Sequence, residues 1–473
     1  MDLFFHLSKD VRTNLFRFDK ERTAQLIHMI TDIKSEGQHS SNKMSRLSAF
    51  GLDTLPIEEI PILQIKNPYS RWKRLSKQKA FEYGNWRRRI PNGKFRKDLR
   101  PNVAYAVDGF EANGSYASVK TFVVFNGQKS AIKVIDESDS DWFELVSHAY
   151  MCQIAQNFSN ITVPKLLFMQ RSPKVDHYND RRGIRRAYHY MTTQVCMERA
   201  EGTPFVKLDN FYMLTALAHA MRAIYQLQKA THFIHRDLSG HNIMYEPSNH
   251  QITFIDFGMT CINPHLAPLS WQKKDEDFYL SEPGSHGAMC TNRSLDPSVL
   301  IAFLSKSHPW CAAEHLEMKR QYKKAIESSD NERAKQALYA PRKGTQYTTI
   351  RPGDWSVGNE LRPWDAEAKE GDGWHWWLFN MIEFPVEYYF PENILCRLLR
   401  LIPLDQWFAI RKGWSSDFDK FMPKDVHVEL DDGRTGVIQK LVRRKLNVLV
   451  GSEVVHVHPY ECKKKPYLNR PDN

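Results

Sequence analysis

The sequence lacks the apolar run of roughly eighteen residues that a membrane-spanning helix needs. Its first residues, MDLFFHLSKDVRTNLFRF, carry too many charges for a secretory signal peptide. Cysteine is scarce, with seven residues scattered over 473 positions, and C-x₂-C pairs are absent. These absences argue against a disulfide framework. We therefore expect an intracellular protein of the cytoplasm or nucleus, with no membrane partner.

Acidic residues are also in deficit, because 66 lysines and arginines face 55 aspartates and glutamates, a net charge of +11. Such an excess favours acidic partners, although it also aids solubility. The cations are dense in residues 66–100, where aromatic residues lie between them. This composition is typical of segments that contact nucleic-acid backbones and bases. A solvated basic linker is the alternative interpretation of the same segment.

The secondary structure expected from the sequence changes several times along the chain. Short alternating apolar runs at 116–125, 129–135 and 188–198 predict strands, and a helical pattern lies between them at 141–156. Residues 210–230 carry an apolar face over several turns and predict a helix. Residues 311–340 read as an exposed, charged helix or pair of helices, and 391–410 again as helical. We find no internal repeat.

Two short polar clusters carry the chemistry, and both lie in FIHRDLSGHNIMYEPSNHQITFIDFG. Phosphoryl transfer from a nucleotide needs an oriented acceptor and ligands for a metal ion that holds the phosphates. Asp237 and Asn242 offer a carboxylate and an amide oxygen from one loop, and Asp256 offers a second carboxylate from the next turn. Oxygen donors of this kind suit Mg²⁺. The bland alternative is that these residues merely cap turns.

HRDLSGHN and DFG resemble the catalytic loop and metal-binding motif of the protein-kinase superfamily. Further parts follow the order that this family requires. ANGSYASV resembles the glycine-rich loop over the phosphates, and SAIKVI resembles the strand with the ATP-binding lysine, here Lys133. Glu144 on the following helix is the candidate partner of Lys133, with Asp141 as the fallback. By this resemblance the nucleotide-binding positions are Gly114, Ala117, Val119, Ala131, Lys133 and Glu144.

The resemblance also assigns roles to the two polar clusters. It implies that Asp237 orients the acceptor hydroxyl and that Asn242 and Asp256 hold Mg²⁺. It further implies that Lys133, steadied by Glu144, contacts the phosphates of ATP. One departure is Ser239, which stands where the familiar Ser/Thr kinases have a lysine two residues after the catalytic aspartate. That departure weakens the argument for a Ser or Thr acceptor.

Three other features have competing interpretations. Residues 424–462 alternate like three or four short strands, with DDGRTG as a hairpin turn, and resemble small SH3-like barrels of the KOW or Tudor type. Such modules bind nucleic acid or peptides, or simply cap a neighbouring domain. Tryptophans at 355–377 favour an insertion packed on the C-terminal lobe over a recognition surface. A zinc site is the weaker interpretation of the cluster His286, Cys290, His308, Cys311 and His315.

We therefore predict an α+β, bilobal protein-kinase-like fold with a small C-terminal β-barrel. The expected domains are a basic, partly helical extension (1–100), a kinase N-lobe (101–200), a C-lobe with a Trp-rich insertion (201–419) and an SH3-like β module with a basic tail (420–473). The expected function is an ATP- and Mg²⁺-dependent protein kinase that acts on Ser or Thr, with nucleic acid as a further non-specific partner. The alternatives are a small-molecule phosphotransferase of the same fold and a pseudokinase that serves as a nucleic-acid-binding scaffold.

Overall fold

The computed structural model describes residues 60, 62–65, 101–107, 111–113, 117–136, 139–179, 185–261, 292–330 and 385–465. These residues form two compact units. The first contains the described residues up to Gln153 together with Val163–Ala200, and the second contains Ile154–Thr162 and the described residues from Glu201 onward. Several features predicted from the sequence lie outside the described residues: Gly114, the basic segment 66–100, His286, Cys290 and the tryptophans at 355–377.

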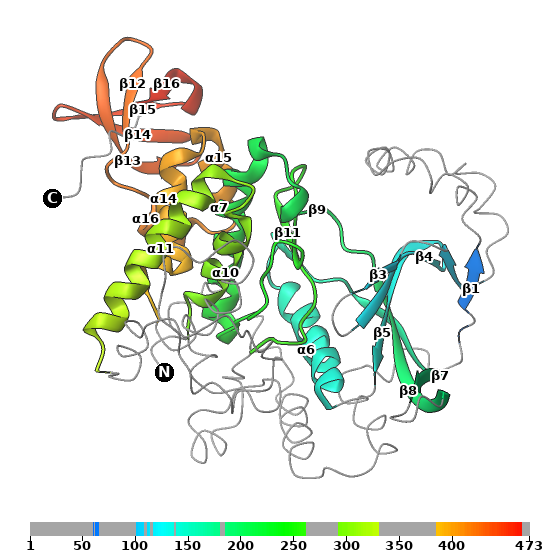
Figure 1. Ribbon diagram of the computed structural model, residues 1–473. Helices are drawn as coiled ribbons and strands as arrows, with labels where there is room; N and C mark the ends of the chain where they lie inside the picture. Colours follow the sequence, from blue (N-terminus) through cyan, green and yellow to red (C-terminus); the bar gives the residue numbers. More distant parts are fainter. Residues whose placement is uncertain are drawn as a thin grey trace, which may run out of the picture. The chain divides into compact units, whose positions relative to one another are not determined.

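A seven-stranded sheet forms most of the first unit (Figure 1), in the order β1-β2-β4-β5-β8-β7, with β3 paired to β4. Only β1 and β2 pair in parallel, and the other neighbours are antiparallel. The strands are β1 (Ile62–Ile65), β2 (Ala104–Val107), β3 (Glu111–Asn113), β4 (Ala117–Phe125), β5 (Gln128–Asp136), β7 (Leu166–Asn179) and β8 (Arg185–Glu198).

The hairpin between β4 and β5 follows from its sequence. Asn126 and Gly127 have φ values of 47° and 76°, and they join the paired residues Phe125 and Gln128. Asn-Gly is favoured in two-residue hairpins because both positions need positive φ. Phe125 packs edge-on against Phe168, with ring centroids 4.8 Å apart, in the core of the sheet. The turn therefore sets the register of β5, the strand that carries Lys133.

Helix α6 (Asp139–Ala155) follows β5 directly. His148 on this helix makes a buried hydrogen bond of 2.6 Å between its Nε2 and the carbonyl oxygen of Pro164. This contact links the helix to the segment that leads into β7. Five strands, β1 to β5, thus precede α6 in this unit, and β7 and β8 follow it. The helix directly after β5 is the one on which the kinase resemblance places Glu144.

The second unit is built around α7 (Asn210–Thr231), whose buried face includes Leu217, Met221 and Ile224. Asp209 begins this helix by accepting a hydrogen bond from the amide of Phe211 at 2.9 Å. His232 ends it in the left-handed region, at φ 50°. A four-stranded sheet follows in the order β6-β11-β10-β9, from β6 (Ile161–Thr162), β9 (Thr203–Pro204), β10 (Ile243–Glu246) and β11 (Gln251–Phe254).

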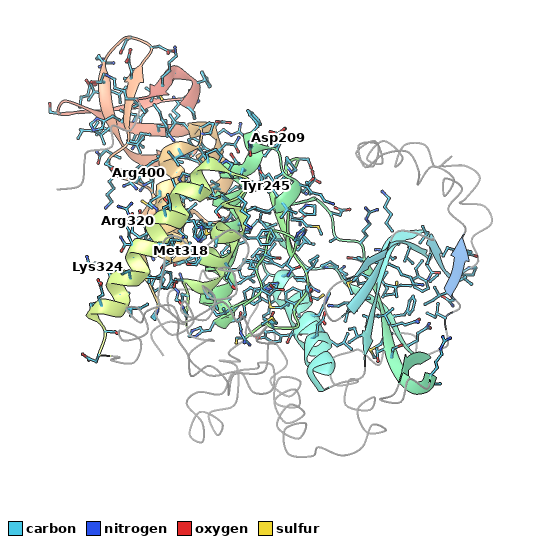
Figure 2. The ribbon with its side chains drawn as sticks, in the orientation of Figure 1. Asp209, Tyr245, Met318, Arg320, Lys324 and Arg400 are labelled. Carbon is cyan, nitrogen blue, oxygen red and sulfur yellow. The ribbon has the colours of Figure 1, made fainter. Side chains whose placement is uncertain are left out.

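Further helices complete this unit: α10 (Leu295–Leu304), α11 (Pro309–Ser328), α14 (Pro391–Leu401), α15 (Leu404–Arg411) and α16 (Ser415–Phe421). Short 3₁₀ turns lie at η6 (Phe205–Lys207) and η8 (Glu387–Tyr389). The prediction that 311–340 is an exposed helix was wrong in one respect. Met318 and Tyr322 on α11 are fully buried, whereas Lys324 is on its exposed face (Figure 2).

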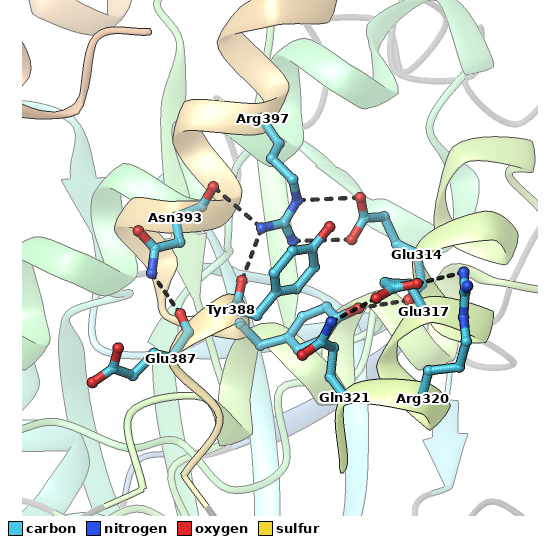
Figure 3. A network of polar contacts seen from close by, with 9 residues as sticks. Glu314, Glu317, Arg320, Gln321, Glu387, Tyr388, Asn393 and Arg397 are labelled. Atoms are coloured by element: carbon cyan, nitrogen blue, oxygen red, sulfur yellow. Dashed lines mark hydrogen bonds and ion pairs between the residues drawn. The ribbon is translucent and has the colours of Figure 1, made fainter. Parts of the chain in front are cut away.

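An ionic network joins α11 to α14 (Figure 3). The Arg397 guanidinium donates from Nη2 and Nε to the two carboxylate oxygens of Glu314, at 2.9 and 3.2 Å. It also lies 3.8 Å from the ring centroid of Tyr388 and donates to that residue's carbonyl oxygen at 2.8 Å. Because both charged side chains are largely buried, this bidentate pair fixes the two helices against each other.

The C-terminal residues of the second unit form a five-stranded antiparallel sheet in the order β15-β14-β13-β12-β16. Its strands are β12 (His427–Leu430), β13 (Thr435–Val442), β14 (Lys445–Val450), β15 (Glu453–Val457) and β16 (Cys462–Lys464), with the 3₁₀ turn η9 (Pro459–Glu461) before the last. Five strands replace the three or four expected from the sequence, and 431–434 form the predicted turn. Closure of this sheet into an SH3-like barrel stays a prediction.

This C-terminal sheet is fastened to the helices of its unit. The Lys464 ammonium donates to the carbonyl oxygens of Leu399, at 2.7 Å, and of Ile402, at the carboxyl end of α14. It also lies 4.8 Å from the Trp407 ring centroid, and the Trp407 indole donates to Leu399 at 2.8 Å. Burial lowers the pKa of Lys464 to about 7. Lys464 therefore supplies donors to helix-end carbonyls that have no partner within the helix.

Candidate active site

The predicted catalytic loop follows α7 and is held by a buried carboxylate that we did not predict. The backbone amides of His235 and Arg236 donate to Asp296 Oδ2 and Oδ1, at 2.7 and 2.8 Å. Asp296 lies in the first turn of α10 and is fully buried. Burial raises the pKa of the Asp296 carboxyl to about 7, and the two amide donors act in the opposite sense. One side chain thus fixes two consecutive amides of the loop.

Arg236 needs this support because its backbone is strained. Its φ is +67°, in the left-handed region that residues other than glycine rarely adopt. Strain of this kind costs about 1–3 kcal/mol and persists where the surrounding structure holds it, often at functional sites. The two hydrogen bonds that Asp296 accepts come from the amide of Arg236 and from the amide of His235 just before it. The pattern indicates a loop whose conformation is set by function as well as by folding.

Asp237 and Asn242 lie together within this loop. The Asn242 amide group donates from Nδ2 to the Asp237 carboxylate at 2.9 Å and to the Asp237 carbonyl oxygen at 2.8 Å. The backbone of the loop closes on itself, since Ser239 N donates to Asp237 O and Asn242 N to Ser239 O. With both of these bonds made by Nδ2, Asn242 Oδ1 accepts no hydrogen bond from the described residues. That amide oxygen is available to a cation.

Asp256 follows β11 and is tied to the same loop. Ile255 N donates to Asn242 O at 3.0 Å, and His235 Nε2 lies 3.0 Å from Ile255 O. The residue just before Asp256 therefore bonds to Asn242, which brings the second carboxylate beside the loop. Asp256 has φ +67° and an exposed side chain, while Phe257 after it is fully buried. The turn sends one side chain into the core and the other toward solvent.

These residues fit a magnesium ion. Asn242 Oδ1 and the Asp256 carboxylate are hard oxygen donors on segments that hydrogen bonds hold together, and Mg²⁺ prefers such ligands. When bound, the ion would neutralise the negative charge of nucleotide phosphates.

In the described parts of the chain, no group of three His, Cys, Asp or Glu side chains could hold a metal. The described members of the weaker zinc cluster, His308, Cys311 and His315, therefore form no such site, and His286 and Cys290 lie outside.

The predicted nucleotide-binding residues lie in the first unit. Lys133 in β5 and Glu144 in α6 form an ion pair, and both residues are buried. Lys133 is flanked in the sheet by Val119 on β4 and Val195 on β8. Ala131 in β5 pairs with Met197, and Ala117 begins β4. The structure thus brings Lys133 and Glu144 together, whereas their contact with a nucleotide stays a prediction.

Comparisons with known proteins point the same way for part of the chain. Residues 176–271 match the phosphotransferase enzyme family (APH). This match includes both polar clusters of the candidate site. No curated protein matches the chain. The match supports phosphotransfer as the general activity, and that chemistry implies use of a nucleotide.

A kinase from a virus is also similar in structure. The PK-1 kinase of Cydia pomonella granulovirus is 18% identical, over 32% of this chain and 53% of the viral one, with a TM-score of 0.21. The match thus spans about half the length of the viral chain. A likeness at this TM-score does not define a fold. Similarity to a phosphotransferase family is thus shown for residues 176–271.

Proposed function

We propose that this protein transfers the γ-phosphate of ATP to a Ser or Thr hydroxyl of another protein. In this proposal Asp237 orients the acceptor hydroxyl, and Asn242 and Asp256 would hold Mg²⁺. Lys133, paired with Glu144, contacts the phosphates. The proposal extends the general phosphotransfer activity to a nucleotide, a metal and an acceptor class.

The observation that carries the proposal is the bond between Asn242 Nδ2 and the Asp237 carboxylate, at 2.9 Å. This bond turns the amide oxygen away from Asp237, so one loop presents a carboxylate for the acceptor and an oxygen for a cation. Phosphoryl transfer depends mainly on such positioning and on electrostatic stabilisation of the phosphates. The link from Ile255 to Asn242 supplies the second carboxylate at the same place.

A protein acceptor is favoured by the motif itself. The sequence keeps Arg236 before Asp237, and Phe257 and Gly258 after Asp256. In the kinase resemblance, small-molecule enzymes usually differ at these positions. Phe257 is fully buried, with its ring centroid 5.6 Å from that of His235, so it packs the metal-binding turn against the catalytic loop.

The family match favours a second candidate, a phosphotransferase that acts on a small molecule. The matched phosphotransferase enzyme family is described without reference to a protein acceptor. Ser239 also removes the lysine that the familiar Ser/Thr kinases have at this position. Both candidates use the same loop and differ in the acceptor that Asp237 meets.

The test supplies the full chain with γ-labelled ATP and Mg²⁺ in parallel reactions. One contains a protein mixture and the other a mixture of hydroxyl- and amine-bearing metabolites. Label on protein Ser or Thr, lost in Asp237→Asn, supports the proposal. Label on metabolites alone supports the second candidate. No transfer to either, with Mg·ATP still bound, would identify a pseudokinase.

A further inference from the structure

The β13–β14 hairpin of the C-terminal sheet ends in a dense group of cations. Val442 pairs with Lys445, so Arg443 and Arg444 form a two-residue turn. Lys440 lies near the end of β13, and all four cations are exposed. None of the four makes an ion pair with any residue that the structure describes. We call Lys440, Arg443, Arg444 and Lys445 the basic tip.

The charges of this sheet are separated along its strands. The turn at Asp431 and Asp432 and the turn before Glu453 lie at the other end of the sheet, because the strands run antiparallel in sequence order. There Arg434 contacts both Asp432 and Glu453. On the side of the tip, Asp425 precedes β12, and Arg400 neutralises it at 3.0 Å. The basic tip therefore keeps its full positive charge.

The turn itself is not optimised for folding. Arg443 has φ +52°, a conformation for which two-residue hairpins favour Asn or Gly. Strained residues of this kind are frequent at functional positions. Here the strain presents a guanidinium at the end of the hairpin.

The hairpin also projects beyond its neighbour. The last residue of β13 that pairs with β12 is Val437, opposite His427, while β13 continues to Val442. On its other side, the final pair with β15 is Leu446 with Val457. The β13 edge of the tip is therefore free of β12, whereas β14 stays paired with β15 up to Leu446.

We propose that the basic tip binds the phosphate backbone of duplex nucleic acid. Arginine pairs with phosphate through two parallel hydrogen bonds, and lysine does so as a point charge. The major groove of B-DNA admits two-stranded β-ribbons, and the basic tip is the turn that joins two antiparallel strands. One row on the sheet adds polar groups, since Lys440 pairs with Asn447, and Asn447 with His456. The turn holds no aromatic or large apolar residue, which a membrane-inserting tip would need.

The test measures how the full chain binds a short fluorescein-labelled DNA duplex, by anisotropy, between roughly 50 and 200 mM salt. The tip variant carries R443Q, R444Q and K445Q. A control variant carries R320Q, K323Q and K324Q and removes the same charge from the exposed face of α11 (Figure 2). A third variant, R443K with R444K, keeps the charge of the tip. Thermal unfolding checks that each variant is folded.

The slope of log affinity against log salt should fall by about 2.7 in the tip variant, from three charges at about 0.9 each. At 0.1 M salt this corresponds to an affinity loss of up to roughly 500-fold. The control and the lysine variant should lose far less. Equal losses in tip and control variants would reduce the effect to net charge and overturn the proposal. Absence of duplex binding, or tip-dependent binding only to phosphatidylserine vesicles, would also overturn it.

Discussion

Replacing Lys133 by Met should abolish phosphoryl transfer. Met keeps the aliphatic stem of the side chain but removes the cation that would contact the phosphates. The structure adds a second consequence, because Lys133 is also the ion-pair partner of Glu144 and both side chains are only 10% and 12% exposed. Removing Lys133 leaves a buried carboxylate without this partner.

The expected cost to stability follows from that burial. Breaking one side of a buried ion pair typically lowers the free energy of unfolding by about 3–5 kcal/mol, whereas replacing both partners costs much less. Lys133→Met alone should therefore be clearly destabilised. The double variant K133M/E144Q should recover most of that loss, because its glutamine carries no charge. Urea unfolding of the two single variants, the double variant and the parent protein gives the coupling energy.

Activity and stability must be read together in this series. We expect no transfer from labelled ATP in either variant that lacks Lys133, including the well-folded double variant. Near-parental turnover in the double variant would refute the nucleotide-binding role of Lys133. A Lys133→Met protein as stable as the parent would refute the argument from burial.

Four further changes test the second unit. Asp256→Asn should weaken Mg·ATP binding measured by calorimetry, while Asp237→Asn should leave binding nearly unchanged and lower kcat; equal losses of binding would mean that these roles are misassigned. Asp296→Ala should speed hydrogen exchange at the two loop amides it now accepts from, at 2.7 and 2.8 Å, and unchanged protection would exclude it as their anchor. Burial holds the pKa of His219 well below 6.5, so the unfolded chain binds more protons and stability falls as pH drops below about 6.5. Between pH 7.5 and 5.5 the protonation of His219 in the unfolded chain should lower the free energy of unfolding by about 1.4 kcal/mol. The His219→Phe variant should lose about 1.4 kcal/mol less than the parent over this pH range. Identical shifts of the urea midpoint in both proteins would contradict this.

The sequence alone predicts those contacts of the candidate site that join residues close together in the chain. Asp237 and Asn242 are five positions apart in one loop, so their meeting needs only that loop to close. Lys133 and Glu144 lie on a strand and the helix directly after it, which makes their contact nearly as local. In such cases spacing and residue type carry most of the information.

Asp296 shows what spacing cannot reveal. Its bond to His235 joins residues 61 positions apart, and the intervening chain carries no pattern that links them. In the sequence, an aspartate before a proline reads as an ordinary helix start. The buried side of α11 escaped prediction for a related reason, since its charged residues outnumber the apolar positions that face the core. The fifth C-terminal strand, β16, has three residues and is too short for alternation to be recognised.

The contact between Lys464 and the end of α14 has a consequence for where the chain can be truncated. A C-terminal sheet of this size looks separable, yet its last strand closes the carboxyl end of a helix that packs on α7. A stop codon placed before β12 would uncover the carbonyls of Leu399 and Ile402 and one side of the Trp407 ring. Truncated products should therefore be less stable than the full chain, whereas point changes at the basic tip should leave the stability unchanged. The helices of this unit and the terminal sheet would then be kept or lost together, because a chain without the sheet also has less stable helices.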